Sequence, residues 1–479
     1  MIFASQAFFV YLPLALLGYH LTRGRDGRYR FLMAASWLFY AWVPPHYWPV
    51  IFALTVLDYA AGLGIARAPT AAGRKRWLAA SVVANLGLLF AFKYTPFAYD
   101  NAATLAGCLG VPLPARAWSI ILPLGISFHT FQGISYTVDV YRRHVRAVTS
   151  FVDYALFVSF FPQLAAGPIV RAVDFLPQMT TPPLVTRQMV ADGIVLFAGG
   201  LAKKLLIADH LDELFVGPVF AHPELFDAGT HRWAVVAWAV QIYCDFSGYT
   251  DMAVGCALWF GFVLPPNFRL PYLATSITDF WRRWHLSLST WLRDYVYFPM
   301  GGSRGSALRT YFNLLTLFVL CGLWHGAAWN WLAYGLYNGV LMCMHRAYDR
   351  AVTGEAAWDR LRGSVPWKLL VWAATTVQFL VGLVLVRQTD WAGGLQMMRS
   401  LLGAAYTPPS AAPAGISPLV PVLIALGLAG HVAGVVRAAL GLPDRPWPEA
   451  LRMTWAAVLV AAVVVFAPGV ARTFIYIQF

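Results

Sequence analysis

Two histidines lie in segments where a titratable side chain could carry out chemistry. His325 stands between Trp324 and Gly326, inside a strongly apolar segment from about residue 314 to residue 341. An ionisable group in such a segment is costly and marks a candidate functional site, with a histidine that only hydrogen-bonds between helices as the alternative. His285 lies in a stretch rich in tryptophan and arginine. A neutral imidazole can take a proton from a hydroxyl group and return it to a leaving group, such as the thiol of a thioester.

Two carboxylates and a phenol interrupt a second apolar run, at about 232–262. Asp245 and Asp251 could pair with an arginine or a histidine, or orient a base, and Tyr249 lies between them. The three side chains could polarise a path through the membrane, whereas carboxylates that are only hydrogen-bonded within a helix bundle are an equal alternative. The histidines, cysteines and acidic residues lack the spacing of a metal site. We therefore expect no bound metal or cofactor.

The residues next to the two histidines could contact a substrate. Arg282 and Arg283 lie close before His285 and could bind the phosphate groups of a cofactor, although arginines that only fix membrane topology are an equal alternative. Trp284 is the neighbour of His285. Trp324 directly precedes His325, and Asn330 lies five positions after it. We expect all five of these side chains to line the substrate site.

The composition is that of a polytopic membrane protein. Of the 479 residues, 59% are hydrophobic and 12% are charged, against about 25% charged residues in a soluble domain. The formal net charge is +13. Because the basic residues gather in short loops between apolar segments, we attribute this charge to membrane topology and not to nucleic-acid binding.

The apolar segments predict roughly ten to twelve membrane-spanning helices. They lie at about 7–21, 31–44, 47–65, 77–96, 118–140, 151–170, 189–209, 232–262, 312–344, 369–387, 416–437 and 452–470. Prolines and glycines break the segment at 151–170, which favours a re-entrant or buried piece. The stretch 267–300 is amphipathic, aromatic and basic, and is typical of short helices at the cytoplasmic face.

The loops alternate between basic and uncharged, which predicts the orientation. Loops at 23–30 and 67–76 are basic, whereas those at 43–48 and 97–117 carry little positive charge. Basic loops face the cytoplasm, so we expect both the N-terminus and the C-terminal stretch 474–479 on the outer side. We treat residues 1–479 as one transmembrane domain, with N-terminal peripheral helices at 1–117, a core at 118–345 and C-terminal helices at 346–479.

These stretches together carry a family likeness. The sequence resembles the membrane-bound O-acyltransferase family, in its bacterial branch that acetylates exopolysaccharides such as alginate. The matching stretches are residues 123–132, 160–171, 241–252, 267–295 and 323–330, with the terminal 474–479. The combination of residues 281–295 with Trp324-His325-Gly326 is highly specific.

The resemblance implies a fold, an activity and a set of partners. The fold would be all-α, with a ring of transmembrane helices around shorter central or re-entrant helices and a tunnel between the two membrane faces. His325 matches the family's catalytic histidine, and His285 matches its second motif histidine. Acetyl-CoA would donate its acetyl group from the cytoplasm, across a bacterial inner membrane, to a polysaccharide. A periplasmic esterase-like partner of the SGNH type would complete the transfer.

Three positions depart from the pattern that the family leads us to expect. His129 replaces an aromatic residue, Asn338 replaces a histidine that relatives often carry, and Val386 stands where an aromatic pair before an arginine is common. We interpret His129 as a packed or bridging histidine. Within the family, D-alanyl transfer to teichoic acid and O-acetylation of peptidoglycan are alternative activities. From another class, a lipid or polymer transporter with His325 as a proton relay is also compatible with broken helices and buried charges.

Overall fold

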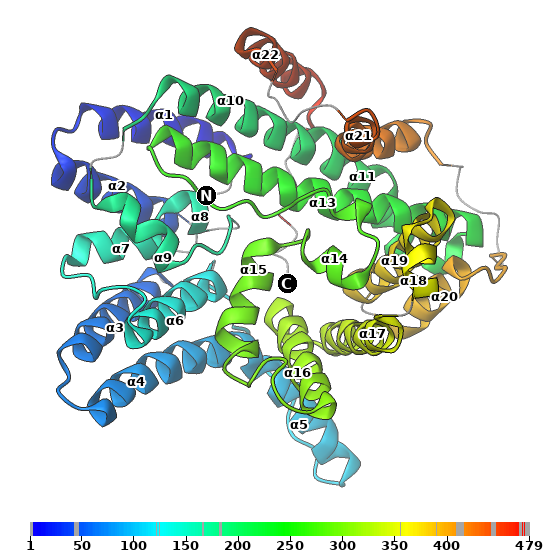
Figure 1. The fold of residues 1–479 in the computed structure, drawn as a ribbon, viewed down its shortest axis with the longest axis horizontal. Helices are drawn as coiled ribbons and strands as arrows, with labels where there is room; N and C mark the ends of the chain where they lie inside the picture. Colours follow the sequence, from blue (N-terminus) through cyan, green and yellow to red (C-terminus); the bar gives the residue numbers. More distant parts are fainter. Residues whose placement is uncertain are drawn as a thin grey trace. The chain divides into compact units, whose positions relative to one another are not determined.

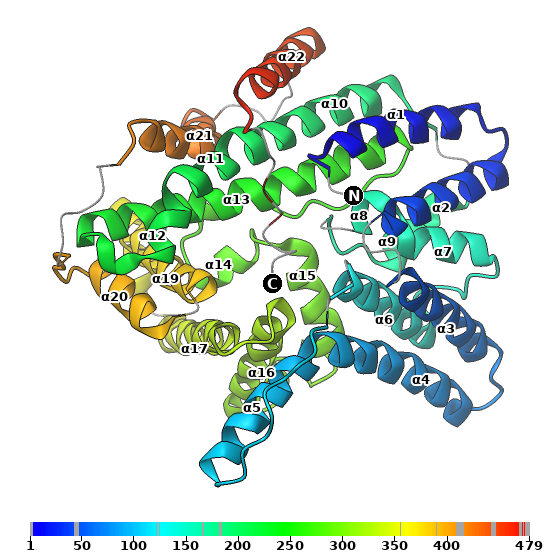
Figure 2. The same ribbon diagram turned by 180° about the vertical axis from the view of Figure 1, so that it is seen from behind.

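The computed structural model describes most of the chain. The described residues are 3–42, 47–120, 122–123, 125–164, 167–181, 184–354, 356–388, 390–408, 416–441, 447–468, 472 and 474. The opening dipeptide, the tip of the uncharged loop near residue 45, much of the loop at 404–415 and the terminal residues 475–479 lie outside them. Every regular element in the described part is helical (Figures 1 and 2), which confirms the predicted all-α class.

The chain divides into two compact units, with residues 1–193 and 252–265 in unit 1 and residues 194–251 and 266–479 in unit 2. Two helices contribute to both units, α10 (Arg187–Ala202) and α13 (Ala228–Trp259). The other elements of unit 1 are α1 (Gln6–Leu21), α2 (Arg25–Ala41), α3 (Trp48–Arg67), α4 (Ala71–Leu89), η2 (Phe90–Tyr94), α5 (Thr95–Cys108), α6 (Ile126–Arg142), α7 (Phe151–Ser159), α8 (Phe161–Leu164), α9 (Ala172–Phe175) and η3 (Leu176–Met179).

Unit 2 continues from α10 in one nearly unbroken helical run and ends with the C-terminal helices. Its elements are η4 (Lys203–Ala208), α11 (Asp209–Leu211), η5 (Asp212–Val216), α12 (Gly217–Ala221), η6 (Pro223–Leu225), η7 (Pro271–Leu273), α14 (Ile277–Trp281), α15 (Leu286–Leu292), η8 (Arg293–Tyr297), α16 (Ala307–His325), α17 (Trp329–Val352), α18 (Ala356–Gly363), α19 (Val365–Arg387), α20 (Trp391–Leu401), α21 (Leu419–Ala439) and α22 (Glu449–Phe466). The amphipathic stretch at 267–300 thus forms short helices, as its pattern predicted.

Six helical segments of the described chain are long and apolar enough to cross a membrane. They are Trp48–Arg67, Ala71–Cys108, Ala307–His325, Val365–Arg387, Leu419–Ala439 and Glu449–Phe466. Other apolar segments of the sequence fall on shorter helices, such as α1 and α6, or on α13, which carries carboxylates. The protein is therefore a multi-pass membrane protein. The segment at 151–170 is broken into α7 and α8.

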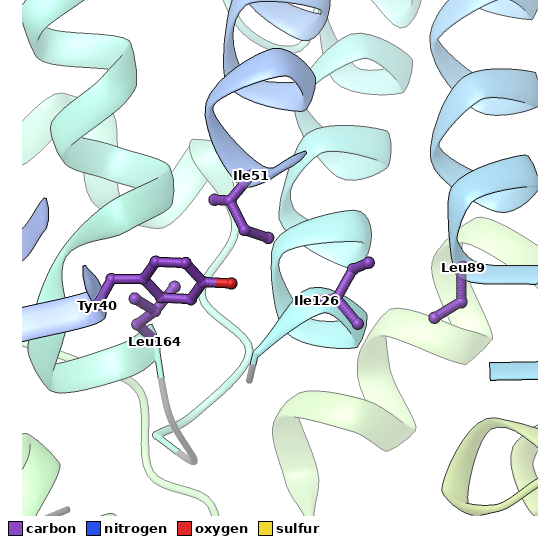
Figure 3. Packing of buried hydrophobic residues seen from close by; sticks show 5 residues of the cluster. All are labelled: Tyr40, Ile51, Leu89, Ile126 and Leu164. Carbon is purple, nitrogen blue, oxygen red and sulfur yellow. The ribbon is translucent and has the colours of Figure 1, made fainter. Parts of the chain in front are cut away.

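Unit 1 is held together by an apolar cluster and a polar one. Tyr40, Ile51, Leu89, Ile126 and Leu164 form a buried apolar cluster that joins the ends of several helices (Figure 3). In a membrane protein, such a cluster contributes through van der Waals packing between helices.

The polar cluster of unit 1 links α3, α4 and α6, which pack against one another (Figures 1 and 2). Asp58 on α3 accepts hydrogen bonds from Ser81 (2.6 Å) and Asn85 (2.8 Å) on α4. On α6, Nε2 of His129 lies 3.0 Å from Oγ1 of Thr55 on α3. His129 therefore bridges two helices, which confirms its interpretation as a structural histidine.

In unit 2, α16 and α17 form a tight helical hairpin. The Ser306 hydroxyl caps α16 by accepting from the Arg309 N–H at 3.2 Å. The helix ends at His325 because Gly326 is extended, with φ −156°. A Cβ atom on Gly322 would lie 3.0 Å from Cα of Gly335, so only glycine permits this approach of the two helices. The hairpin turn therefore fixes His325 at a helix end.

Candidate active site

His325 is buried, with 8% of its surface exposed, and its ring is held in one orientation. Its Nδ1 lies 2.7 Å from the Cys321 carbonyl oxygen, one helical turn earlier. A carbonyl can only accept, so Nδ1 carries the proton and Nε2 of the neutral ring carries the lone pair. The ring stacks on Trp331 with centroids 5.1 Å apart and an angle of 9° between planes. His325 is thus oriented as a proton acceptor through Nε2.

His285 has the opposite tautomer. Its Nδ1 accepts the Leu288 N–H at 3.3 Å and caps the N-terminus of α15. Nδ1 therefore lacks a proton, and Nε2 of the neutral ring is a donor. The side chain is fully buried, and its ring meets the Phe246 ring at 4.7 Å.

One tryptophan contacts both histidines. The Trp324 ring lies edge-on to His325 at 4.9 Å and to His285 at 6.0 Å. Burial, and then the nearby imidazole of His325, lower the pKa of His285 well below its ordinary value. His285 lies outside the six long apolar helices, yet it is uncharged at neutral pH. The tertiary structure therefore brings together the two histidines that the sequence singled out.

His285 adopts an uncommon backbone conformation that a neighbouring loop supports. Its φ is +46°, in the left-handed region that few residues other than glycine adopt. The next residues are tied to buried Asn267. The Leu286 N–H donates to the Asn267 carbonyl at 3.0 Å, and the N–H and hydroxyl of Ser287 donate to its side-chain oxygen at 3.1 and 2.9 Å. Asn267 therefore positions His285, although the sequence-based reasoning assigned no role to this side chain.

The two carboxylates of α13 pair with lysines, whereas the sequence analysis considered an arginine or a histidine as the partner. Lys204 is 3% exposed, and its Nζ lies 2.6 Å from Asp245 and 2.8 Å from Asp209. Lys203 contacts Asp251 at 2.5 Å and the Ser247 hydroxyl at 3.1 Å. Both lysines begin the π-helical turn η4, and such turns are frequent at functional sites. The ionic cluster links α13 to the helical run after α10.

The C-terminal tail reaches the same cluster. The Arg472 backbone N–H donates to Asp209 at 3.1 Å, and its guanidinium lies 2.6 Å from Asp212. Phe474 is fully buried, and its ring lies 4.5 Å from that of Tyr249 and 5.7 Å from that of Phe246. Through Phe246, the tail residue Phe474 contributes to the packing around His285.

The remaining predicted residues lie in varied surroundings. Arg282 is exposed, whereas Arg283 contacts Asp279 at 2.9 Å. Trp284 is buried and stacks with Phe280 at 5.7 Å. These positions leave Arg282 as the more accessible of the two arginines for an incoming phosphate.

Asn330 lies at the start of α17 and is largely buried. Its side-chain amide donates to the Leu385 carbonyl at 3.2 Å and so ties α17 to α19. Asn338, which replaces the histidine common in relatives, donates to the Tyr334 carbonyl within α17 at 2.9 Å. Among the residues that the structure describes, no group of three or more histidine, cysteine or acidic side chains could hold a metal ion.

The sequence-based reasoning missed several residues of this site. Tyr334 contacts the His325 ring, and it could have been found from its helical spacing after the hairpin turn. Lys203 and Lys204 are ionisable residues within an apolar segment, which is the same signal that pointed to His325. Asn267 gave no comparable signal, because its role depends on a contact with residues about twenty positions away.

The chain belongs to the membrane-bound O-acyltransferase family, whose sequence model matches residues 124–386. That range contains both histidines, and it confirms the resemblance drawn from the motifs. The protein is therefore an O-acyltransferase of the membrane.

Named relatives extend this result. The chain is 40% identical to the probable alginate O-acetylase AlgI of Azotobacter vinelandii, over 81% of this chain and 75% of the relative. It is 34% identical to the peptidoglycan O-acetyltransferase of Helicobacter pylori, over 82% of this chain and 78% of the relative. The teichoic acid D-alanyltransferase of Bacillus subtilis is 29% identical over 56% of this chain and 68% of the relative.

Proposed function

We propose that the protein moves an acetyl group from cytoplasmic acetyl-CoA across a bacterial inner membrane for O-acetylation of an extracytoplasmic polysaccharide such as alginate. The names and coverage of the relatives support acetyl transfer over D-alanyl transfer, because the O-acetylase relatives match a larger share of the chain. The polysaccharide is inferred from the relatives named for alginate. O-acetylation of peptidoglycan is a second candidate acceptor reaction, favoured by the Helicobacter pylori relative.

The observation that carries the proposal is the pair of complementary histidine tautomers. His325 would act as the general base through Nε2, because its Nδ1–H is committed to the Cys321 carbonyl. His285 would present its Nε2–H to the thioester carbonyl oxygen and stabilise the negative charge that develops there. A base and a donor on neighbouring rings are what acyl transfer to a hydroxyl group requires.

The reaction then balances within the site. His325 takes the proton of the attacking hydroxyl group, while the hydroxyl oxygen forms a bond to the acetyl carbonyl carbon. The carbon–sulfur bond breaks, and the imidazolium returns the proton to the departing thiolate. The products are the acetyl ester and the free thiol, and the histidine is restored to its starting tautomer.

Other site residues would hold the substrates. Exposed Arg282, together with Arg283, would bind the phosphate groups of acetyl-CoA. Trp284, Trp324 and Asn330 would shape the pocket around the thioester. Asp245 and Asp251, with their lysine partners, and Tyr249 would line a polar tunnel between the two membrane faces.

The proposal also includes a partner and an orientation. An SGNH-type periplasmic acetyltransferase would receive the acetyl group and complete its transfer to the polymer. Both termini would lie in the periplasm, as the distribution of basic loops predicts. Reporter fusions placed after residues 30 and 479 test this orientation, because an enzyme that is active only in the periplasm would report the second fusion alone.

Acetyl transfer by purified protein in proteoliposomes tests the function. With labelled acetyl-CoA, we expect label on a glycan or on the partner protein. His325→Asn keeps an amide that can donate to the Cys321 carbonyl but removes the base, so the rate should fall by about 10²–10⁴ while the protein still inserts and accumulates. His222→Asn is the control, because this histidine is exposed.

The rivals give different results in the same vesicles. Dependence on a carrier protein, without use of acetyl-CoA, would favour D-alanyl transfer. Movement of a lipid or polymer without acyl chemistry would favour a transporter. Normal acetylation by the His325→Asn protein would refute the role of His325.

A further inference from the structure

A basic cavity lies in unit 1, away from the two histidines in the sequence and without a role in the proposed reaction. Its volume is about 650 Å³, and it is lined by the ends of α3, α4 and α6 and by the loop after α6. Four arginines contribute to its wall, Arg67, Arg74, Arg143 and Arg146. The residues that line it include no carboxylate.

The positive charge of this cavity is not neutralised by the described part of the protein. Arg67, Arg143 and Arg146 are exposed, and no acidic side chain among the described residues pairs with them. Arg74 donates to the Tyr141 carbonyl at 2.5 Å, and its guanidinium lies 5.2 Å from the centroid of the Tyr141 ring. These contacts orient Arg74 but leave its charge uncompensated. Guanidinium groups stay charged at all physiological pH values, so an anion in the cavity would relieve their mutual repulsion.

The position of the cavity along the membrane-spanning helices indicates the kind of anion. Arg67 is the last residue of an apolar helix of 20 residues that is long enough to cross the bilayer. Arg74 lies in the first turns of the next candidate span, which begins at Ala71. Residues at the ends of spans lie in the layer of lipid headgroups, where basic pockets between helices bind anionic lipids.

The rest of the wall also suits an amphiphile. Leu63 and Val145 line the cavity beside the arginines and are partly exposed. Aliphatic side chains offer contact to the glycerol and acyl parts of a lipid, whereas a free phosphate ion would gain nothing from them.

We propose that this cavity is a binding site for a phosphate group, held by several arginines, and that the phosphodiester of an anionic membrane lipid occupies it. Arginine forks match the geometry of phosphate oxygens and can each form two hydrogen bonds. A bound lipid would join α3, α4 and α6 at one membrane face and would stabilise their packing by mass action.

Lipid binding to the purified full-length protein tests this proposal. The protein in detergent is mixed with phosphatidylglycerol or with phosphatidylcholine, and retained lipid is counted by native mass spectrometry. Inorganic phosphate and glycerol phosphate are added in separate samples as competitors. Arg67→Gln, Arg143→Gln and Arg146→Gln are combined in one variant, in which phosphatidylglycerol should bind at least about tenfold more weakly. A second variant with lysine at the three positions keeps the charge and reports on binding if the glutamine variant does not fold.

A matched control separates a site from general attraction to basic loops. Arg23, Arg30 and Arg76 are exposed arginines in basic stretches of unit 1 that do not line the cavity, and their change to glutamine removes the same charge. We expect this control to bind phosphatidylglycerol within about twofold of the unchanged protein.

Each outcome decides the proposal. Selective loss of phosphatidylglycerol in the cavity variant supports the lipid site. If the unchanged protein binds phosphate or glycerol phosphate but no lipid, and the cavity variant loses that binding, the result supports a phosphate site whose ligand is soluble. Equal losses of phosphatidylglycerol binding in the cavity and control variants would overturn the proposal. It would also be overturned if the unchanged protein bound phosphatidylglycerol no better than phosphatidylcholine and did not bind phosphate or glycerol phosphate.

Discussion

The turn that carries His285 makes a sharp prediction for Asn267. Replacement by leucine keeps the approximate size of the side chain but removes the oxygen that accepts from the Ser287 N–H at 3.1 Å and from its hydroxyl at 2.9 Å. Asn267 is 1% exposed and Ser287 is 5% exposed, so water cannot readily take over either hydrogen bond. The variant Asn267→Leu therefore leaves two buried donors without an acceptor.

The cost can be worked out from these contacts. An unsatisfied buried polar group costs about 1–3 kcal/mol, which gives about 2–6 kcal/mol for the two donors if neither finds a new partner. The left-handed conformation of His285 is a strain of about 1–3 kcal/mol that the unchanged protein already carries, and it persists only where its surroundings impose it. We expect the turn to relax and to move the His285 ring. A displacement of about 1 Å at a reacting group lowers the rate by about 10²-fold.

Acetyl transfer in proteoliposomes, together with thermal unfolding of each variant, tests this reasoning. Ser287→Ala is the matched control, because it removes only the hydroxyl and leaves the N–H bonded to Asn267. Its rate should stay within about fivefold of the unchanged protein, which corresponds to the roughly 1 kcal/mol of a single hydrogen bond. If Asn267→Leu folds and works at a rate within about threefold of the unchanged protein, then Asn267 does not hold the catalytic turn.

Three further changes test other contacts of the site. A Cβ atom in Gly326→Ala would collide with the Trp331 ring that stacks on His325, so we expect altered tryptophan fluorescence and a rate at least about tenfold lower; an unchanged rate would refute the need for this stacking. Lys204→Met leaves Asp245 buried without its cation and should lower the free energy of unfolding by about 3–5 kcal/mol in a denaturation assay, whereas Lys204→Met with Asp245→Asn should recover part of the loss. Phe474→Ala removes a fully buried ring next to the site and should lower the unfolding free energy by about 3–5 kcal/mol, with an effect below about 1 kcal/mol as the result that would contradict the buried position of the tail.

Part of the fold and site follows from local sequence patterns. The low share of charged residues excludes a soluble domain, and the lengths of the apolar runs require helices that can cross a bilayer. His325 was identifiable because an ionisable residue in an apolar segment is costly. Its hydrogen bond to Cys321 is also local, since it spans a single helical turn. Prolines and glycines likewise indicated the break between α7 and α8.

Pairings between distant segments could not be predicted in the same way. Two lysines occupy an apolar run of the sequence, and nothing in that run shows that α13 places Asp245 and Asp251 beside them. From the sequence, an arginine or a histidine was a possible partner for each carboxylate. The path of the chain decided otherwise, because any cation that reaches a buried carboxylate satisfies it.

The sequence by itself determined the membrane class, the family and the two histidines, because each depends on residue type and short spacing. The tertiary structure decided which nitrogen of each ring holds the proton. The Cys321 carbonyl can only accept and the Leu288 N–H can only donate, so the two backbone groups assign opposite tautomers to His325 and His285. The sequence specifies an imidazole at each position, but the direction of the neighbouring backbone dipole makes one ring an acceptor and the other a donor.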